Sequence, residues 1–255
     1  MTHAGVGMLA EVADLSGLTA GLTSMFARAG HRWRVHDPGV TMVRAAVAIA
    51  DGMTNVSRVE GFCGSRPAIF SDPASRCTIG RAIYAFGDEL MPVRLDSVMA
   101  DTRTRVWDAA GYDPESLTVD VDATLLDVHS DKQHAAGTFK RGFGFHPLGM
   151  WLDETCEPLA MLFRAGNAGS NTAVDHCDEV MRSIDQLPAA YRAGHGYGDN
   201  PDDVIHPMLV RSDSAGASKA FLAELVGRNI ECSVGFAVDT RVRALINAVD
   251  DDAWA

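Results

Sequence analysis

The chain lacks the cysteine patterns that mark disulfide frameworks and zinc sites. Its 255 residues include five cysteines, which are scattered, odd in number and without any Cys-x-x-Cys pair. This usage is typical of a reducing compartment, and we expect a cytoplasmic location. Long apolar runs are also missing: no stretch approaches the roughly 20 residues that a membrane-spanning helix needs, and the first residues do not resemble a signal peptide. We therefore expect a soluble protein without a membrane partner.

An excess of basic residues is absent as well. The chain has 22 basic and 34 acidic residues, and residues 1–110 carry eleven arginines and eleven acids, so all the excess negative charge lies in the remainder. Proteins that bind duplex DNA usually show a basic footprint, because neutralising phosphates supplies most of the affinity. The chain as a whole shows none. Any contact with nucleic acid must come from local clusters such as residues 28–36 or 132–141.

Helical signals dominate the first part of the chain, up to about residue 112. With 47% apolar residues the chain can bury one large core or two small ones. In the segment His36 to Gly52, Asp37 suits an N-cap, Pro38 suits the first helical position, and apolar residues recur at helical spacing. Further helices are predicted over Gly7 to Leu15, Leu18 to Ala29, Thr78 to Ala85 and Asp88 to Ala109. The sequence thus predicts a small all-α module.

After residue 113 the pattern changes to strands that alternate with helices. Strands are predicted over Leu117 to Leu126, Phe145 to Leu152, Pro158 to Arg164, Met208 to Asp213 and Glu231 to Val238. Helices are predicted over Asn171 to Leu187, Ala217 to Arg228 and Thr240 to Val249. Only a short turn separates the second and third strands, so these two should be antiparallel neighbours. The prediction is an α/β domain with three early strands, followed by helix, strand, helix and strand.

Two of these strands end in aspartates that are far apart in sequence. The first strand carries Asp120 and Asp122, and the fourth ends at Asp213. The element order is that of a ribonuclease-H-like mixed sheet, in which the first and fourth strands are neighbours. Asp122 and Asp213 could then share one divalent metal, Mg²⁺ or Mn²⁺. A third acid is needed, because Mg²⁺ wants near-octahedral oxygen ligands and phosphoryl displacement normally uses two ions.

Four segments, in the same order, resemble the DDE-type insertion-sequence transposases of bacteria, in the group-one DDE-domain branch. The resemblance covers nearly the whole chain. The segments are Asp120-Val-Asp-Ala-Thr-Leu-Leu-Asp-Val-His-Ser-Asp-Lys132, Thr138-Phe-Lys-Arg-Gly-Phe-Gly-Phe-His-Pro-Leu148, Glu157-Pro-Leu-Ala-Met-Leu-Phe-Arg-Ala-Gly-Asn-Ala-Gly-Ser-Asn-Thr-Ala173 and Val210-Arg-Ser-Asp-Ser-Ala-Gly216.

The resemblance implies a metal-dependent enzyme that cleaves and transfers DNA strands, with Asp122 and Asp213 as the first two catalytic acids. Asp122 matches because Thr124 follows it in an Asp-x-Thr context. The implied partners are the terminal inverted repeats of the element and further copies of the chain. In this family the third acid is a glutamate on a helix well after the fifth strand, and we expect it to be missing. The implied domains are therefore 1–112, a helical candidate for DNA binding, and 113–255, a catalytic domain that is incomplete at its C-terminus.

Several alternatives stay open. Asp120 rivals Asp122 as the first metal ligand, because residues two apart on a strand share a face. Lys140, Arg141 and Arg211 are candidates to hold DNA phosphates. Asp120-Val-Asp-Ala-Thr also matches the nucleophile motif of haloacid-dehalogenase-type phosphatases, with Asp120 as nucleophile and Asp122 as general acid. Without a third acid, the chain would be a truncated, catalytically impaired transposase, a non-catalytic DNA-binding remnant or an inhibitor of a full-length relative.

Overall fold

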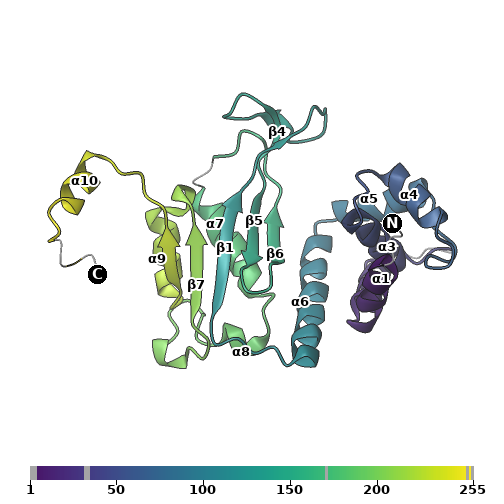
Figure 1. The fold of residues 1–255 in the computed structure, drawn as a ribbon, viewed down its shortest axis with the longest axis horizontal. Helices are drawn as coiled ribbons and strands as arrows, with labels where there is room; N and C mark the ends of the chain where they lie inside the picture. Colours follow the sequence, from purple (N-terminus) through teal and green to yellow (C-terminus); the bar gives the residue numbers. More distant parts are fainter. Residues whose placement is uncertain (1–4, 32–34, 170–171, 251–252, 254–255) are drawn as a thin grey trace. The chain divides into compact units, whose positions relative to one another are not determined.

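The chain divides into a helical unit and an α/β unit (Figure 1). The computed structural model describes residues 5–31, 35–169, 172–250 and 253. The helical unit extends to Asp113 and includes Gln186–Pro188, and the α/β unit comprises Pro114–Asp185 and the residues from Ala189 onward. No helix in the described part combines the length and the apolar character needed to cross a bilayer.

Helices build the first unit. The helices are α1 (Gly5–Leu15), α2 (Leu18–Arg28), α3 (Pro38–Ala50), α4 (Val56–Gly64), α5 (Arg76–Tyr84) and α6 (Met91–Ala110), with the short η1 (Ala85–Gly87) before α6. As predicted, Asp37 caps α3, where its carboxylate accepts the N–H of Val40 at 2.9 Å. α4 was not predicted from the sequence, although Asn55 caps it by accepting the N–H of Arg58 at 3.0 Å.

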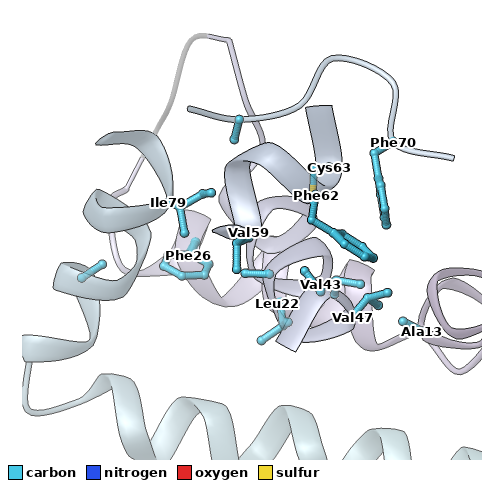
Figure 2. Packing of buried hydrophobic residues seen from close by; sticks show 14 of the residues in the cluster. Ala13, Leu22, Phe26, Val43, Val47, Val59, Phe62, Cys63, Phe70 and Ile79 are labelled. Atoms are coloured by element: carbon cyan, nitrogen blue, oxygen red, sulfur yellow. The ribbon is translucent and has the colours of Figure 1, made fainter. Parts of the chain in front are cut away.

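The core of the helical unit is one cluster of apolar side chains (Figure 2). α2 and α3 pack closely, and they contribute Leu22, Phe26, Val43 and Val47. Phe62 of α4 packs against the ring of Phe70, with ring centroids 6.1 Å apart. Burying each large side chain of this kind contributes roughly 1.5–3 kcal/mol, so the cluster supplies the main driving force for folding the unit.

A five-stranded mixed sheet forms the centre of the α/β unit. Its strands are β1 (Leu117–Ala123), β5 (Leu148–Leu152), β6 (Glu157–Leu162), β7 (Met208–Ser212) and β8 (Glu231–Val234), in the order β6-β5-β1-β7-β8. β1, β5 and β6 are antiparallel neighbours, and β7 and β8 extend the sheet parallel to β1. This arrangement confirms the ribonuclease-H-like fold, the predicted hairpin and the adjacency of the first and fourth predicted strands.

α7 (Ala173–Ile184) and α9 (Lys219–Gly227) cover one face of this sheet. The unit also contains the short α8 (Ala189–Arg192), η2 (Pro201–Asp203) and η3 (Ser214–Gly216), and α10 (Thr240–Ile246), which has no buried residue. α7 packs against β5 and β6, and α9 packs against β8 and α7. Along β1 the buried residues Leu117, Val119 and Val121 alternate with partly exposed Thr118 and Asp120. The acids of β1 therefore lie on the face away from these helices.

Two predicted strands are shorter than expected because a second, small sheet lies between them. The first predicted strand ends at Ala123, and the second is interrupted at His146 and Pro147 before β5 begins. Pro147 has no N–H to donate to a strand partner, and its carbonyl instead accepts the N–H of Thr124 at 3.0 Å. The intervening residues form β2 (Leu126–Asp127), β3 (Ala136–Gly137) and β4 (Phe143–Phe145), in the order β2-β4-β3.

Candidate metal centre

Asp122 and Asp213 both follow the last pair of the β1–β7 register, Val121 and Ser212. Asp120 pairs with Arg211 and Val121 pairs with Ser212, so the next positions along the two parallel strands are Asp122 and Asp213. Both aspartates are exposed. Asp213 follows the last residue of β7 with an extended backbone, and its Oδ1 accepts the N–H of Ala215 at 2.8 Å. If the register continues by one residue, the two carboxylates lie beside each other at this end of the sheet.

The surroundings of Asp122 leave its carboxylate accessible. The Thr124 hydroxyl lies 3.5 Å from Oδ2 of Asp122 and donates to it. On the other side, β5 places Gly149 opposite Asp122. A Cβ atom on Gly149 would overlap the indole ring of Trp151, so the ring occupies the space that a side chain at this position would need. The absence of a side chain at Gly149 allows the Trp151 ring to lie over the residue that is paired with Asp122.

Asp120 has a different environment, because Arg211 binds it. Arg211 donates from Nε to Oδ1 of Asp120 at 2.6 Å and from Nη2 to Oδ2 at 2.7 Å, and Nη2 also lies 3.0 Å from Oδ2 of Asp153. The hydrogen bonds to Asp120, together with the negative charges of Asp120 and Asp153, raise the pKa of the Arg211 guanidinium above its usual value. Both oxygens of Asp120 are therefore engaged, whereas those of Asp122 are free of any cationic partner among the described residues.

This contrast bears on two alternatives left open by the sequence. A metal ligand or a nucleophile needs an available carboxylate oxygen, which favours Asp122 over Asp120 as the first ligand and gives no support to the phosphatase interpretation. The guanidinium of Arg211 already faces two carboxylates, so its role as a phosphate-binding group stays a prediction. The other two predicted DNA-binding residues, Lys140 and Arg141, lie in the turn between β3 and β4, and both are exposed.

No third acid joins Asp122 and Asp213 in the described residues. No group of three or more His, Cys, Asp or Glu side chains lies in a position to hold a metal ion within residues 5–31, 35–169, 172–250 and 253. Glu224 on α9 is bound to Arg228, with 2.8 Å between Oε1 and Nε. Glu231 pairs with Leu209, at the start of β7 and away from the end that carries Asp213. The basic cluster at residues 28–36 falls partly outside the described residues, at 32–34.

The ion pair between Arg211 and Asp120 was not predicted from the sequence, although the sequence contains a signal for it. The two residues are 211 − 120 = 91 positions apart, the same offset as 213 − 122 = 91 between the paired aspartates. Once the two strands are paired in register, this offset places Arg211 opposite Asp120 as surely as it places Asp213 beside Asp122. No sequence spacing predicts that Asp153 also pairs with Arg211, because this contact depends on how the turn between β5 and β6 lies beside β1.

The sequence family that matches the chain is the transposase DDE domain, group 1, and the match extends over residues 1–255. The chain belongs to this family. The match confirms the resemblance that was inferred from the four ordered segments. A comparison with curated protein sequences found no match.

Among solved structures, the chain is similar to two complexes of Mos1 transposase. One is a paired-end complex with the left transposon end; it is 10% identical with a TM-score of 0.28, and the similarity covers 87% of this chain and 74% of that one. The other is a pre-cleavage Mos1 transpososome, which is 9% identical with a TM-score of 0.28, and the similarity covers 79% and 59%. At this level the comparison adds nothing to what the strand order shows.

Proposed function

We propose that the chain takes part in DNA transposition and that Asp122 and Asp213 form two-thirds of its divalent-metal site. The observation that supports this proposal is the β1–β7 register, which pairs Val121 with Ser212, the residues just before Asp122 and Asp213 on adjacent parallel strands. Membership of the transposase DDE domain family supports the reaction class. The strand register supports the choice of residues independently of that membership, since it follows from the fold alone.

The residues present fit Mg²⁺ or Mn²⁺. Carboxylate oxygens are the ligands that these hard cations prefer, and two of them leave other positions for water and for a DNA phosphate. When bound, such an ion polarises the scissile phosphate and activates the attacking water or 3′-hydroxyl. The protein's own part is to hold the two carboxylates: Asp122 is fixed by the sheet and by Thr124, and Asp213 by its cap on η3.

DNA is the proposed partner, and the terminal inverted repeats of the element are the proposed target, bound by a homo-oligomer. Lys140 and Arg141 project from an otherwise acidic unit and have no ion-pair partner among the described residues. We assign these two residues to phosphate contacts. Arg211, which is bound to Asp120 and Asp153, would contact phosphate only if DNA displaced one of these carboxylates.

We further propose that residues 1–255 by themselves cleave DNA poorly or not at all. The described residues provide two acids at the site and no third one, and an in-line displacement assisted by two ions needs a more complete cage. This observation also favours the second candidate function, in which the chain binds DNA without cutting it and inhibits a complete relative through mixed oligomers.

Titration of the full chain with Mn²⁺, followed by electron paramagnetic resonance, tests the metal site. Asp122→Asn and Asp213→Asn should each weaken Mn²⁺ binding by at least about tenfold, or roughly 1.4 kcal/mol. Asp178→Asn, which changes an exposed aspartate on α7, is the matched control and should bind as the unchanged protein does. Equal Mn²⁺ affinity in all four proteins would overturn the site.

Nicking of a supercoiled plasmid in the presence of Mn²⁺ distinguishes an active from an impaired chain. The plasmid makes the assay independent of the terminal repeats. We expect band shifts with DNA and no nicking above that of the Asp122→Asn variant. Nicking that requires Asp122 would show that two acids suffice and would contradict the proposed impairment. Inhibition is tested by adding the chain to a complete relative, whose cleavage should fall as mixed oligomers form.

A further inference from the structure

The small sheet of the α/β unit stands directly next to the proposed metal site. It leaves the main sheet through Thr124, two residues after Asp122, and returns to it at β5, whose Gly149 lies opposite the same aspartate. In Figure 1 this sheet, labelled at β4, lies beyond the arrowhead of β1. Whatever the small sheet binds is therefore held close to the carboxylates of Asp122 and Asp213.

The segment that forms the small sheet has a small excess of positive charge, in contrast to the rest of the chain. Residues 124–147 contain Lys132, Lys140 and Arg141 against two aspartates, whereas the chain as a whole has a net charge of −12. The three cationic side chains are exposed, and no hydrogen bond or ion pair occupies their charged groups in the part of the chain that the structure describes. A local cluster of free cations on an acidic protein indicates an anionic partner, because elsewhere the acidic surface repels one.

Two exposed phenylalanine rings lie in the same segment of the chain. Phe139 is 66% exposed and precedes Lys140, whose ammonium lies 5.8 Å from the centre of its ring. Phe143 is 40% exposed, and the imidazole of His129 stacks on it with ring centroids 6.1 Å apart and planes 19° from parallel. Exposed phenylalanine rings beside cations are typical of surfaces that bind single-stranded nucleic acid, where bases stack on the rings and cations contact the phosphates.

The segment that carries Phe139 is a fixed turn. Thr138 donates its N–H to the carbonyl of Gly142 at 2.9 Å, Arg141 donates to the carbonyl of Thr138 at 3.0 Å, and Gly142 donates to the Thr138 hydroxyl at 3.0 Å. These bonds place Phe139 and Lys140 at the corner of the turn. A turn whose backbone is already held in place loses less conformational freedom when a base stacks on its side chain, which favours binding.

We propose that the small sheet is a platform for unpaired DNA nucleotides, with bases stacked on Phe139 and Phe143 and phosphates held by Lys132, Lys140 and Arg141. The inference rests on the proposed function and deepens it: the bound form is DNA that has opened next to the metal site. A closed duplex would use only the cations, because its base faces are hidden within the helix. An unpaired strand uses the cations and the rings together.

The test measures binding of a fluorescent 12-nucleotide DNA strand and of the matching duplex to the full chain, in EDTA, by anisotropy. Phe139→Ala combined with Phe143→Ala should weaken single-strand binding by about tenfold or more and leave duplex binding within about twofold. Lys140→Ala combined with Arg141→Ala should weaken both and reduce the salt dependence. Tyr84→Ala and Lys219→Ala, which remove an exposed ring and an exposed lysine elsewhere, are the matched controls. Far-ultraviolet circular dichroism verifies that each variant folds.

Two results would overturn the platform: unchanged single-strand affinity in the folded double phenylalanine variant, or tighter binding of duplex than of single strand by the unchanged protein. An RNA strand of the same sequence that bound more tightly than DNA would also contradict the assignment to DNA. Because EDTA removes divalent ions, this measurement does not depend on the metal site. The Mn²⁺ titration without DNA tests Asp122 and Asp213 alone, so the two proposals fail separately.

Discussion

The helical unit and the α/β unit use their charged residues differently. Residues 1–110 balance eleven arginines against eleven acids around one buried apolar cluster, and packing accounts for most of what is seen there. The α/β unit carries the whole negative excess, and it exposes carboxylates at strand ends and cations on the small sheet. Exposed charge does not stabilise a core, so the strand-end carboxylates and the cations of the small sheet need a functional explanation.

The largest stability effect should come from the core of the helical unit. Leu22→Ala removes a side chain that is 6% exposed and should lower the free energy of unfolding by about 2–5 kcal/mol. Leu15→Ala makes the same change at a residue that is 79% exposed, where the cost should stay within about 0.5 kcal/mol. Urea denaturation followed by circular dichroism measures both. Similar losses in the two variants would contradict the apolar cluster as the source of stability.

Replacing glycine by alanine should change the free energy of unfolding in opposite directions at one position in each unit. Gly149→Ala introduces a Cβ where the indole of Trp151 packs and should destabilise by about 1–3 kcal/mol. Gly80→Ala, in the middle of α5, meets nothing within 4 Å and should stabilise by about 0.5–1 kcal/mol, because alanine has less chain entropy to lose. The readout is the midpoint of thermal unfolding, followed by circular dichroism. A stabilised Gly149→Ala protein would show that the ring moves aside without cost.

The bond between β1 and β7 should depend on the shape of the Arg211 side chain as well as on its charge. Arg211→Lys keeps the charge but loses the two parallel hydrogen bonds to Asp120, so the melting temperature should fall, and the difference should shrink as salt is added. Arg241→Lys is the control, since Arg241 is almost fully exposed and lies 3.7 Å from Asp239. Calorimetry at low and high salt compares the two. An equal fall of the melting temperature in both variants would argue against a specific role for the two parallel hydrogen bonds from Arg211 to Asp120.

The smallest effect concerns thiol reactivity, which reports on each unit separately. Burial raises the pKa of the Cys63 thiol in the helical unit and of Cys177 in the α/β unit, so less of each is present as the reactive thiolate at a given pH. Alkylation at pH 8, followed by mass spectrometry, should modify these two last and the exposed cysteines first, namely Cys77, Cys156 and Cys232. Leu22→Ala should speed the labelling of Cys63 and not of Cys177. Faster labelling of both would show that the units unfold together.

Local signals were sufficient for most of the secondary structure. Asp37 and Pro38 marked the start of α3, and alternation of apolar residues marked β1 and β7. α4 was not predicted because two glycines within Val56–Gly64 weaken its helical pattern, even though its cap at Asn55 is present. The small sheet was not predicted because its strands are two or three residues long, which is too short for a periodicity of apolar residues to appear.

For the candidate site, the sequence by itself determined that two strands end in aspartates 91 residues apart and that an arginine is opposite the acid two positions earlier. Only the tertiary structure decided how these groups differ. The sheet register and the return of the β5–β6 turn bring Arg211 onto Asp120 and Asp153, which leaves Asp122 without a cationic partner in the described residues. Spacing along a strand specifies which residues share a face, but the partner of each carboxylate depends on side chains that reach it from other strands.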